Sequence, residues 1–124
     1  IVVAGQPIAQ PRAKVSTRGG FARAYVDKRH PVHAYRDSIA SHWQKHVGEV
    51  IEGPLEVEIE FVMQKPKSAR RAMPTVKPDC SNMIKAVEDS LNGIAWQDDS
   101  QIVRLVASKR YGSPATIIEV RKFQ

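Results

Sequence analysis

Hydrophobic and polar residues alternate most regularly over residues 55–63 of the chain. The hydrophobic positions are Leu55, Val57, Ile59, Phe61 and Met63, and the positions between them are largely glutamates. Because successive side chains of a strand point to opposite faces of a sheet, this alternation predicts a half-buried β-strand. Weaker patterns predict strands over residues 1–7, 101–111 and 115–123, with a turn at Gly112-Ser113-Pro114 between the last two.

Two segments carry the three- and four-residue spacing of amphipathic helices. The first follows Pro31, which suits an initial helical turn, and ends near Gly48. Its hydrophobic positions are Val32, Tyr35, Ile39, Trp43 and Val47. The second runs from about Cys80 to Leu91 and is closed by Asn92-Gly93, a pair suited to left-handed backbone geometry. Its hydrophobic side, expected to face a sheet, consists of Met83, Ile84, Val87 and Leu91.

The order of these elements predicts an α+β fold in which two helices pack on a small mixed β-sheet. With 124 residues the chain is expected to be a single domain over residues 1–124. No hydrophobic run approaches the ~20 residues of a membrane span, and no basic-then-apolar secretion signal stands at the start. A single cysteine, Cys80, excludes an internal disulfide and favours a reducing compartment such as the cytoplasm. The sequence begins at Ile1 rather than Met, which leaves open how many residues precede it in the natural protein.

Positive charge is in excess, with 19 Lys and Arg against 13 Asp and Glu and a net charge of +6 at pH 7. This balance favours polyanions, nucleic acid before an anionic membrane, although it can also serve solubility alone. The basic residues gather in residues 12–29, expected to form a loop or hairpin arm, and in residues 65–77, which prolines keep irregular. The candidates for nucleic-acid contact, and so for any contact with DNA, are Arg12, Lys14, Arg18, Arg23, Lys67, Arg70, Arg71 and Lys77.

Carboxylates stand at both ends of the second predicted helix. Asp79 precedes it, where its simplest role is to cap the first turn, and Asp98 and Asp99 precede the next strand, where they could form a polar turn. Converging carboxylates also make the oxygen-rich site that Mg²⁺ prefers, and Lys85 would add a positive group near a phosphate. Alternatively, Lys85 and Asp89 form a surface pair one helical turn apart. Spacing alone leaves these alternatives open.

Other candidates for chemistry are weaker. His42 and His46 lie one turn apart, but the Glu of the zinc-protease motif is absent between them, so both are expected at the surface. Trp43 and Trp96 could stack on bases, yet core or interface packing is favoured.

The segment KPDCSNMIKAVEDSLNGIAWQDDSQIV, residues 77–103, resembles the core motif of the RusA-like Holliday junction resolvases. That motif has Asp-x-Asp-Asn near a helix start, a Lys in the helix and an Asp-Asp pair before the next strand. AYRDSIA at residues 34–40 and the basic segment after Gly5-Gln6-Pro7 resemble the family's first helix and its substrate-facing arm. The resemblance implies a homodimeric bacterial or bacteriophage endonuclease, dependent on Mg²⁺ or Mn²⁺, that recognises and cuts four-way DNA junctions in recombination and repair.

Position by position, the resemblance assigns the catalytic residues as Asp79, Lys85 and Asp99, and the metal ligands as Asp79, Asp98 and Asp99, with Asp99 the stronger of the pair. The chain departs from the motif at Ser81, which stands where the family has its second Asp. A hydroxyl lacks the charge and the metal affinity of a carboxylate. The sequence leaves two outcomes open: an active enzyme in which water, Asp98 or a substrate oxygen fills the gap, or a DNA-binding protein of the same fold with weak or no catalysis.

Overall fold

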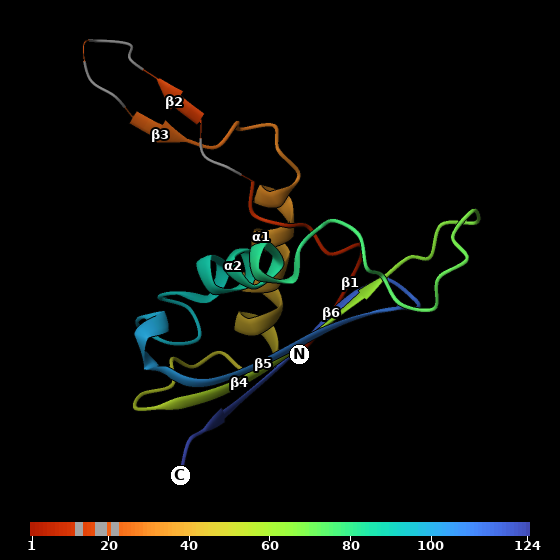
Figure 1. The fold of residues 1–124 in the computed structure, drawn as a ribbon. Helices are drawn as coiled ribbons and strands as arrows, with labels where there is room; N and C mark the ends of the chain where they lie inside the picture. The colour runs from red at the N-terminus through yellow and green to blue at the C-terminus, as the bar shows by residue number, and fades with distance from the viewer. Residues whose placement is uncertain (12–13, 17–19, 21–22) are drawn as a thin grey trace.

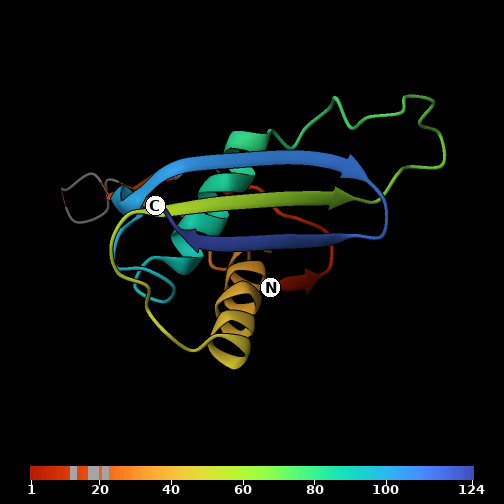
Figure 2. The ribbon, with the colours of Figure 1, turned by 90° about the horizontal axis from the view of Figure 1, so that it is seen from below.

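The computed structural model describes residues 1–11, 14–16, 20 and 23–124, and for residues 14–16, 23 and 24 it describes the backbone alone. Its main sheet has the spatial order β1 (Val2–Ala4), β6 (Ala115–Lys122), β4 (Leu55–Met63) and β5 (Ile102–Tyr111). β4 runs parallel to β5 and antiparallel to β6. Helices α1 (Val32–His46) and α2 (Cys80–Leu91) lie on one face of this sheet (Figure 1, Figure 2). The predicted α+β fold, with a mixed sheet and two helices, is confirmed.

The connection between β5 and β6 crosses the end of β4. The two strands follow each other in the chain, yet β4 lies between them (Figure 2). Gly112, in this connection, donates from its N–H to the carbonyl of Met63 at 2.9 Å. A Cβ atom at Gly112 would lie 2.8 Å from Cγ1 of Val62, so the crossing requires a residue without a side chain. The crossing leaves β5 at the edge of the sheet.

The core lies between the sheet and the two helices. On α1 the predicted positions Val32, Tyr35, Ile39 and Trp43 are buried. Val47 was predicted to join them, but it follows the last helical residue and is 40% exposed, because the chain turns away at Gly48 with φ of +75°. The residues of α2 that enter the core are Met83, Ala86, Val87 and Leu91.

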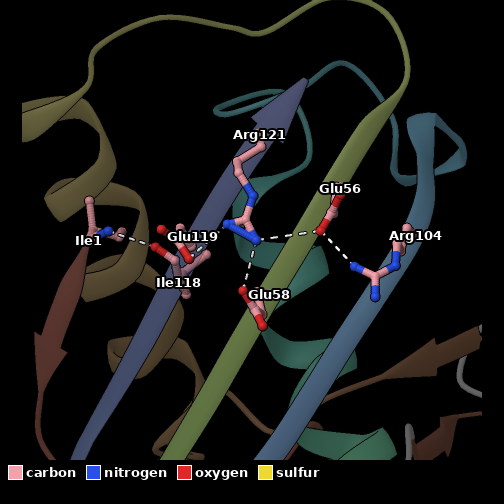
Figure 3. A network of polar contacts seen from close by, with 7 residues as sticks. All are labelled: Ile1, Glu56, Glu58, Arg104, Ile118, Glu119 and Arg121. Atoms are coloured by element: carbon pink, nitrogen blue, oxygen red, sulfur yellow. Dashed lines mark hydrogen bonds and ion pairs between the residues drawn. The ribbon is translucent and has the colours of Figure 1, made fainter. Parts of the chain in front are cut away.

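The outer face of the sheet carries a network of ion pairs (Figure 3). It joins Arg104 and Arg121 with Glu56, Glu58 and Glu119, and on the same face Arg110 forms a separate pair with Glu60. Arg121 alone contacts three of these glutamates, at 2.8–3.4 Å. Exposed pairs of this kind contribute only about 0–1 kcal/mol each. The network therefore matters more for the charge of this face, where four carboxylates slightly outnumber three guanidinium groups.

Two basic segments extend from this body (Figure 1). The antiparallel strands β2 (Lys14–Ser16) and β3 (Arg23–Tyr25) form the predicted hairpin arm, on the helix side of the sheet. Residues 64–78 form an irregular loop beyond the end of β4. Arg12 and Arg18 lie outside the described residues, and Lys14 and Arg23 are described by their backbone alone. Of the described helices, none combines the length and hydropathy needed to cross a membrane.

Candidate functional site

Asp79 is the residue immediately before α2. Its backbone is extended, with φ of −71° and ψ of 142°, and its carboxylate makes no capping hydrogen bond. An Asp at this position usually accepts a hydrogen bond from an N–H group of the first turn. The structure therefore does not show the simple capping role, and it leaves the exposed carboxylate to other partners.

Asp79 lines a surface cavity of about 730 Å³ together with Ala9, Lys77, Pro78 and Asn82. The N–H of Gln10 donates to the carbonyl of Asn82 at 2.9 Å, so the segment that leads into the hairpin arm lies against the first turn of α2. The cavity is thus bordered by the base of the arm, the end of the 64–78 loop and the start of α2. It brings together a carboxylate, an amide and an ammonium group.

The backbone that leads into Asp79 is held by Lys109 of β5. Nζ of Lys109 donates to the carbonyl oxygen of Val76 at 2.8 Å and to that of Pro78 at 3.0 Å. Hydrogen bonds from a charged donor are stronger than those between neutral groups. Lys109, on the edge strand β5, therefore restrains the backbone of residues 76–78 just before α2.

Asp98 lies outside the Asp79 cavity, in the turn before β5. It caps the short 3₁₀ helix Asp99–Gln101, and its carboxylate accepts a hydrogen bond from the N–H of Ser100 at 3.2 Å. The hydrogen bonds from Ser100 lower the pKa of Asp98. Asp98 lines a second surface cavity of about 780 Å³, which also includes Glu52. The structure thus places Asp79 and Asp98 on different cavities.

One side chain, Gln101, holds this acidic turn in place. Its Oε1 accepts hydrogen bonds from the N–H groups of Gln97, at 2.8 Å, and Asp98, at 3.2 Å. Its Nε2 donates to the carbonyls of Ile51, at 3.1 Å, and Gly53, at 3.0 Å. The turn that carries Asp98 and Asp99 is therefore tied to the loop between α1 and β4.

The carboxylate of Asp99 acts electrostatically on Glu88 of α2. Burial raises the pKa of Glu88, the nearby charge of Asp99 raises it further, and Lys85 acts in the opposite direction. Nζ of Lys85 lies 3.5 Å from the carboxylate of Asp89, and the Lys85 side chain is 64% exposed. The surface pair considered for Lys85 is therefore present, at the edge of a group that also includes Glu88 and Asp99.

Asp79 and Asp99 lie near different parts of α2. Glu88, whose pKa Asp99 raises, follows Asp79 by nine positions, which corresponds to about 13 Å along a helix axis. Among the described residues, no three His, Cys, Asp or Glu side chains are placed to hold one metal ion. Ser81 and Asn82 are both exposed in the first turn, beside Asp79 rather than Asp99.

Residues 4–121 of the chain match the family model of Endodeoxyribonuclease RusA. The chain belongs to the RusA family. A relative from Bacillus subtilis (strain 168), named "Uncharacterized protein YqaN", is 32% identical over 136 aligned residues, which cover 97% of this chain and 93% of that protein. The RusA match spans both helices, both basic segments and every acidic residue discussed above.

In this RusA-family chain the 64–78 loop presents exposed basic side chains, namely Lys67, Arg70, Arg71 and Lys77. The loop is anchored to the end of β5, because Nε of Arg71 donates to the hydroxyl of Tyr111 at 3.0 Å. Nζ of Lys65 also lies 5.8 Å from the centre of the Tyr111 ring. A guanidinium has five N–H donors, so the other four N–H donors of Arg71 lie outside its hydrogen bond to Tyr111.

The aromatic and histidine candidates take structural roles. Trp43 and Trp96 are 3% and 0% exposed, so the predicted packing role is confirmed. A hydrogen bond of 2.8 Å joins Nδ1 of His42 to the carbonyl of Ser38.

Sequence reasoning missed three residues of the site: Gln101, Lys109 and Glu88. Gln101 and Lys109 bind backbone carbonyls of segments far away in the chain, and every residue has a carbonyl, so no residue pattern marks these contacts. Glu88 did leave a signal. It follows Lys85 by three residues, which places the two on neighbouring positions of one RusA helix.

Proposed function

We propose that this RusA-family protein is a Mg²⁺-dependent endodeoxyribonuclease that binds branched DNA as a homodimer and cuts four-way (Holliday) junctions in recombination and repair. One observation carries the proposal most directly. The exposed, uncapped carboxylate of Asp79 lies in a cavity beside a basic loop, in a chain of an endodeoxyribonuclease family.

The basic loop supports DNA as the substrate. It carries four exposed basic residues, and one of them, Lys77, lines the Asp79 cavity. Contacts between such residues and phosphates position a duplex without reading its sequence. Selectivity for a junction then comes from the spatial arrangement of its arms relative to the loop and the hairpin.

The residues around Asp79 suit Mg²⁺. Asp79 and Asn82 offer hard oxygen ligands, and Mg²⁺ commonly takes only one or two protein carboxylates beside water and phosphate oxygens. Mn²⁺ accepts the same ligand types. When bound, the ion would activate water and neutralise charge on the phosphodiester. Lys85, largely exposed, would exchange its contact with Asp89 for the scissile phosphate.

The separate placement of Asp79 and the Asp98–Asp99 pair supports the homodimer. Asp79 and Asp98 line different cavities. The α2 residue whose pKa Asp99 raises is Glu88, about 13 Å along the helix from Asp79, and Mg²⁺–oxygen distances are about 2 Å. We propose that Asp79 of one copy and Asp99 of the other, assisted by Asp98, form each site. A dimer then has two sites, as paired cuts require.

Mixed dimers test the shared site. Asp79→Asn and Asp99→Asn proteins, each inactive alone, are expected to regain nicking when they are unfolded together and refolded as a mixture, because one site of each mixed dimer is intact. Mass spectrometry would confirm that mixed dimers have formed. If they have formed and nicking is not recovered, each site lies within one chain.

The function itself is tested with a synthetic four-way junction and a linear duplex of matched sequence, in Mg²⁺ and then in EDTA. The expected result is metal-dependent nicking of the junction, lost in Asp79→Asn and Asp99→Asn but kept in Asp37→Asn, an exposed control on α1. Junction binding without any metal-dependent nicking would contradict the nuclease.

The second candidate is a DNA-binding protein of the same fold with weak or no catalysis. Ser81 in place of the motif Asp and the Lys85–Asp89 pair favour it. Ser81→Asp separates the two candidates. A large gain of nicking would show that Ser81 limits catalysis, and unchanged nicking would show that the site functions without the second carboxylate.

A further inference from the structure

We propose that Lys109 is a positioning residue that frees the carboxylate of Asp79 from its capping role by holding the start of α2 from the sheet side. The inference rests on the proposed function, because it gives Asp79 a task other than stabilising the helix. It concerns a lysine outside the block of residues 77–103 that carries the motif.

Both peptide groups that flank the Cα atom of Asp79 are held by hydrogen bonds. The carbonyl of Pro78, which shares a planar peptide group with the N–H of Asp79, accepts from Nζ of Lys109 at 3.0 Å. The carbonyl of Asp79 accepts from the N–H of Met83 at 3.1 Å. With both planes held, the direction of the Asp79 side chain is largely determined by its own rotamer.

The lysine itself extends from a well-supported position. Lys109 pairs with Phe61 in the register between β5 and β4, and Phe61 is fully buried. Because partners in register point to the same side of a sheet, Lys109 points to the face that the helices cover. Its ammonium also donates to the carbonyl of Val76 at 2.8 Å, so the carbonyls of two residues that lie two positions apart share one donor group.

Helix stability alone does not account for this lysine. A helix start is normally ordered by the side chain of its N-cap residue, and the positive end of the helix dipole disfavours a nearby cation. Here the N-cap side chain is an unengaged carboxylate, and the cation orders the backbone in its place. The arrangement fits a start of α2 at which Asp79 must keep its oxygens for a metal ion or a substrate.

The experiment compares Lys109→Met with wild type and with Lys122→Met, which makes the same change of charge on β6. In Lys109→Met, kcat for junction nicking is expected to fall roughly 10-fold, as for other residues that orient a metal ligand. The Mg²⁺ concentration for half-maximal rate should rise, while junction affinity stays close to that of Lys122→Met. Lys109→Arg, whose fork can still donate to two carbonyls, should recover most of the rate.

A second readout does not depend on activity. In wild type, Mn²⁺ should broaden the amide resonances of residues 79–82, and Lys109→Met should need more Mn²⁺ for the same broadening. A crystal structure of Lys109→Met should show the Asp79 carboxylate accepting from the N–H of Ser81 or Asn82. If Lys109→Met does not fold, Lys109→Gln and Lys109→Arg serve for the same comparison.

The outcomes separate the two proposals. A wild-type protein that never nicks junctions overturns the proposed function, and the broadening measurement then decides the role of Lys109. Wild-type nicking with unchanged kcat and Mg²⁺ dependence in folded Lys109→Met overturns the positioning role and leaves the nuclease intact.

Discussion

Nε1 of Trp96 donates a 2.7 Å hydrogen bond to Oδ1 of Asn92, closing the turn that leads from α2 to the acidic pair. The Trp96 ring is fully buried. Asn92→Ala would leave a buried indole N–H without its partner and should lower the free energy of unfolding by about 1–3 kcal/mol. Urea unfolding measures the change. Asn92→Asp, which keeps the acceptor oxygen, should lose much less, and equal losses in both variants would contradict this role of the hydrogen bond.

Gln101 should be needed both for stability and for the position of the acidic turn. Gln101→Glu retains an acceptor for the N–H groups of Gln97 and Asp98, but it sets a carboxylate against the carbonyls of Ile51 and Gly53. We expect it to lower the free energy of unfolding by about 1–3 kcal/mol. Thermal and urea unfolding check this, and a Gln101→Glu protein as stable as wild type would show that the contacts to the 51–53 loop contribute little.

Glu88 should make the protein less stable as pH rises. Burial and the charge of Asp99 raise its pKa above the usual 4.5, so the folded state binds a proton more tightly than the unfolded state does. Ionisation of Glu88 therefore destabilises the folded state. This loss of stability begins near pH 4.5 and is complete above the raised pKa. Glu88→Gln should be more stable than wild type at pH 7 and equally stable near pH 3, as measured by urea unfolding. If Glu88→Gln differed from wild type by the same free energy of unfolding at both pH values, ionisation of Glu88 would not be the source of the difference.

Tyr35 should make stability fall in strong alkali. Burial raises its pKa to about 12, against a hydrogen bond with Thr116 that lowers it. Because the unfolded state releases the phenolic proton first, the stability of the folded state should decrease between about pH 10 and pH 12. Tyr35→Phe should lose this part of the pH dependence. It should also cost about 1–3 kcal/mol at pH 7, since the buried hydroxyl of Thr116 loses its partner.

Lys67 should contribute to the salt dependence of DNA binding. If its ammonium contacts one phosphate, Lys67→Gln should reduce the slope of log K against log salt concentration by about 0.9. Lys45→Gln, in the last turn of α1, removes the same charge away from the loop and should leave the slope unchanged. Equal slopes for both variants and wild type would place Lys67 outside the DNA contact.

The elements of this fold were largely predictable because their signals are local. The alternation over residues 55–63 and the spacing over residues 80–91 match β4 and α2 to the residue. The position of β4 between β5 and β6 was not predictable, because strand order depends on pairing between distant segments. Val47 shows the same limit at small scale: its spacing fits the apolar face of α1, but the helix ends one residue earlier.

The acidic residues of the site were predictable as residue types, and their grouping was not. Spacing along the chain suggested one cluster, whereas Asp79 and Asp98 line different cavities in the structure. The contacts that hold each of them, from Lys109 and from Gln101, end on backbone carbonyls. Such contacts depend on tertiary structure and leave no mark in the local sequence.

The ion pairs on the outer face of the sheet have a consequence for how a polyanion would approach. That face is slightly negative in a chain whose net charge is +6, so the positive excess lies elsewhere, including the exposed loop of residues 64–78. The separation gives the molecule an electric dipole moment. At low salt a DNA junction would therefore be turned towards the loop before any contact forms, and added salt would weaken this orientation along with the rate of association.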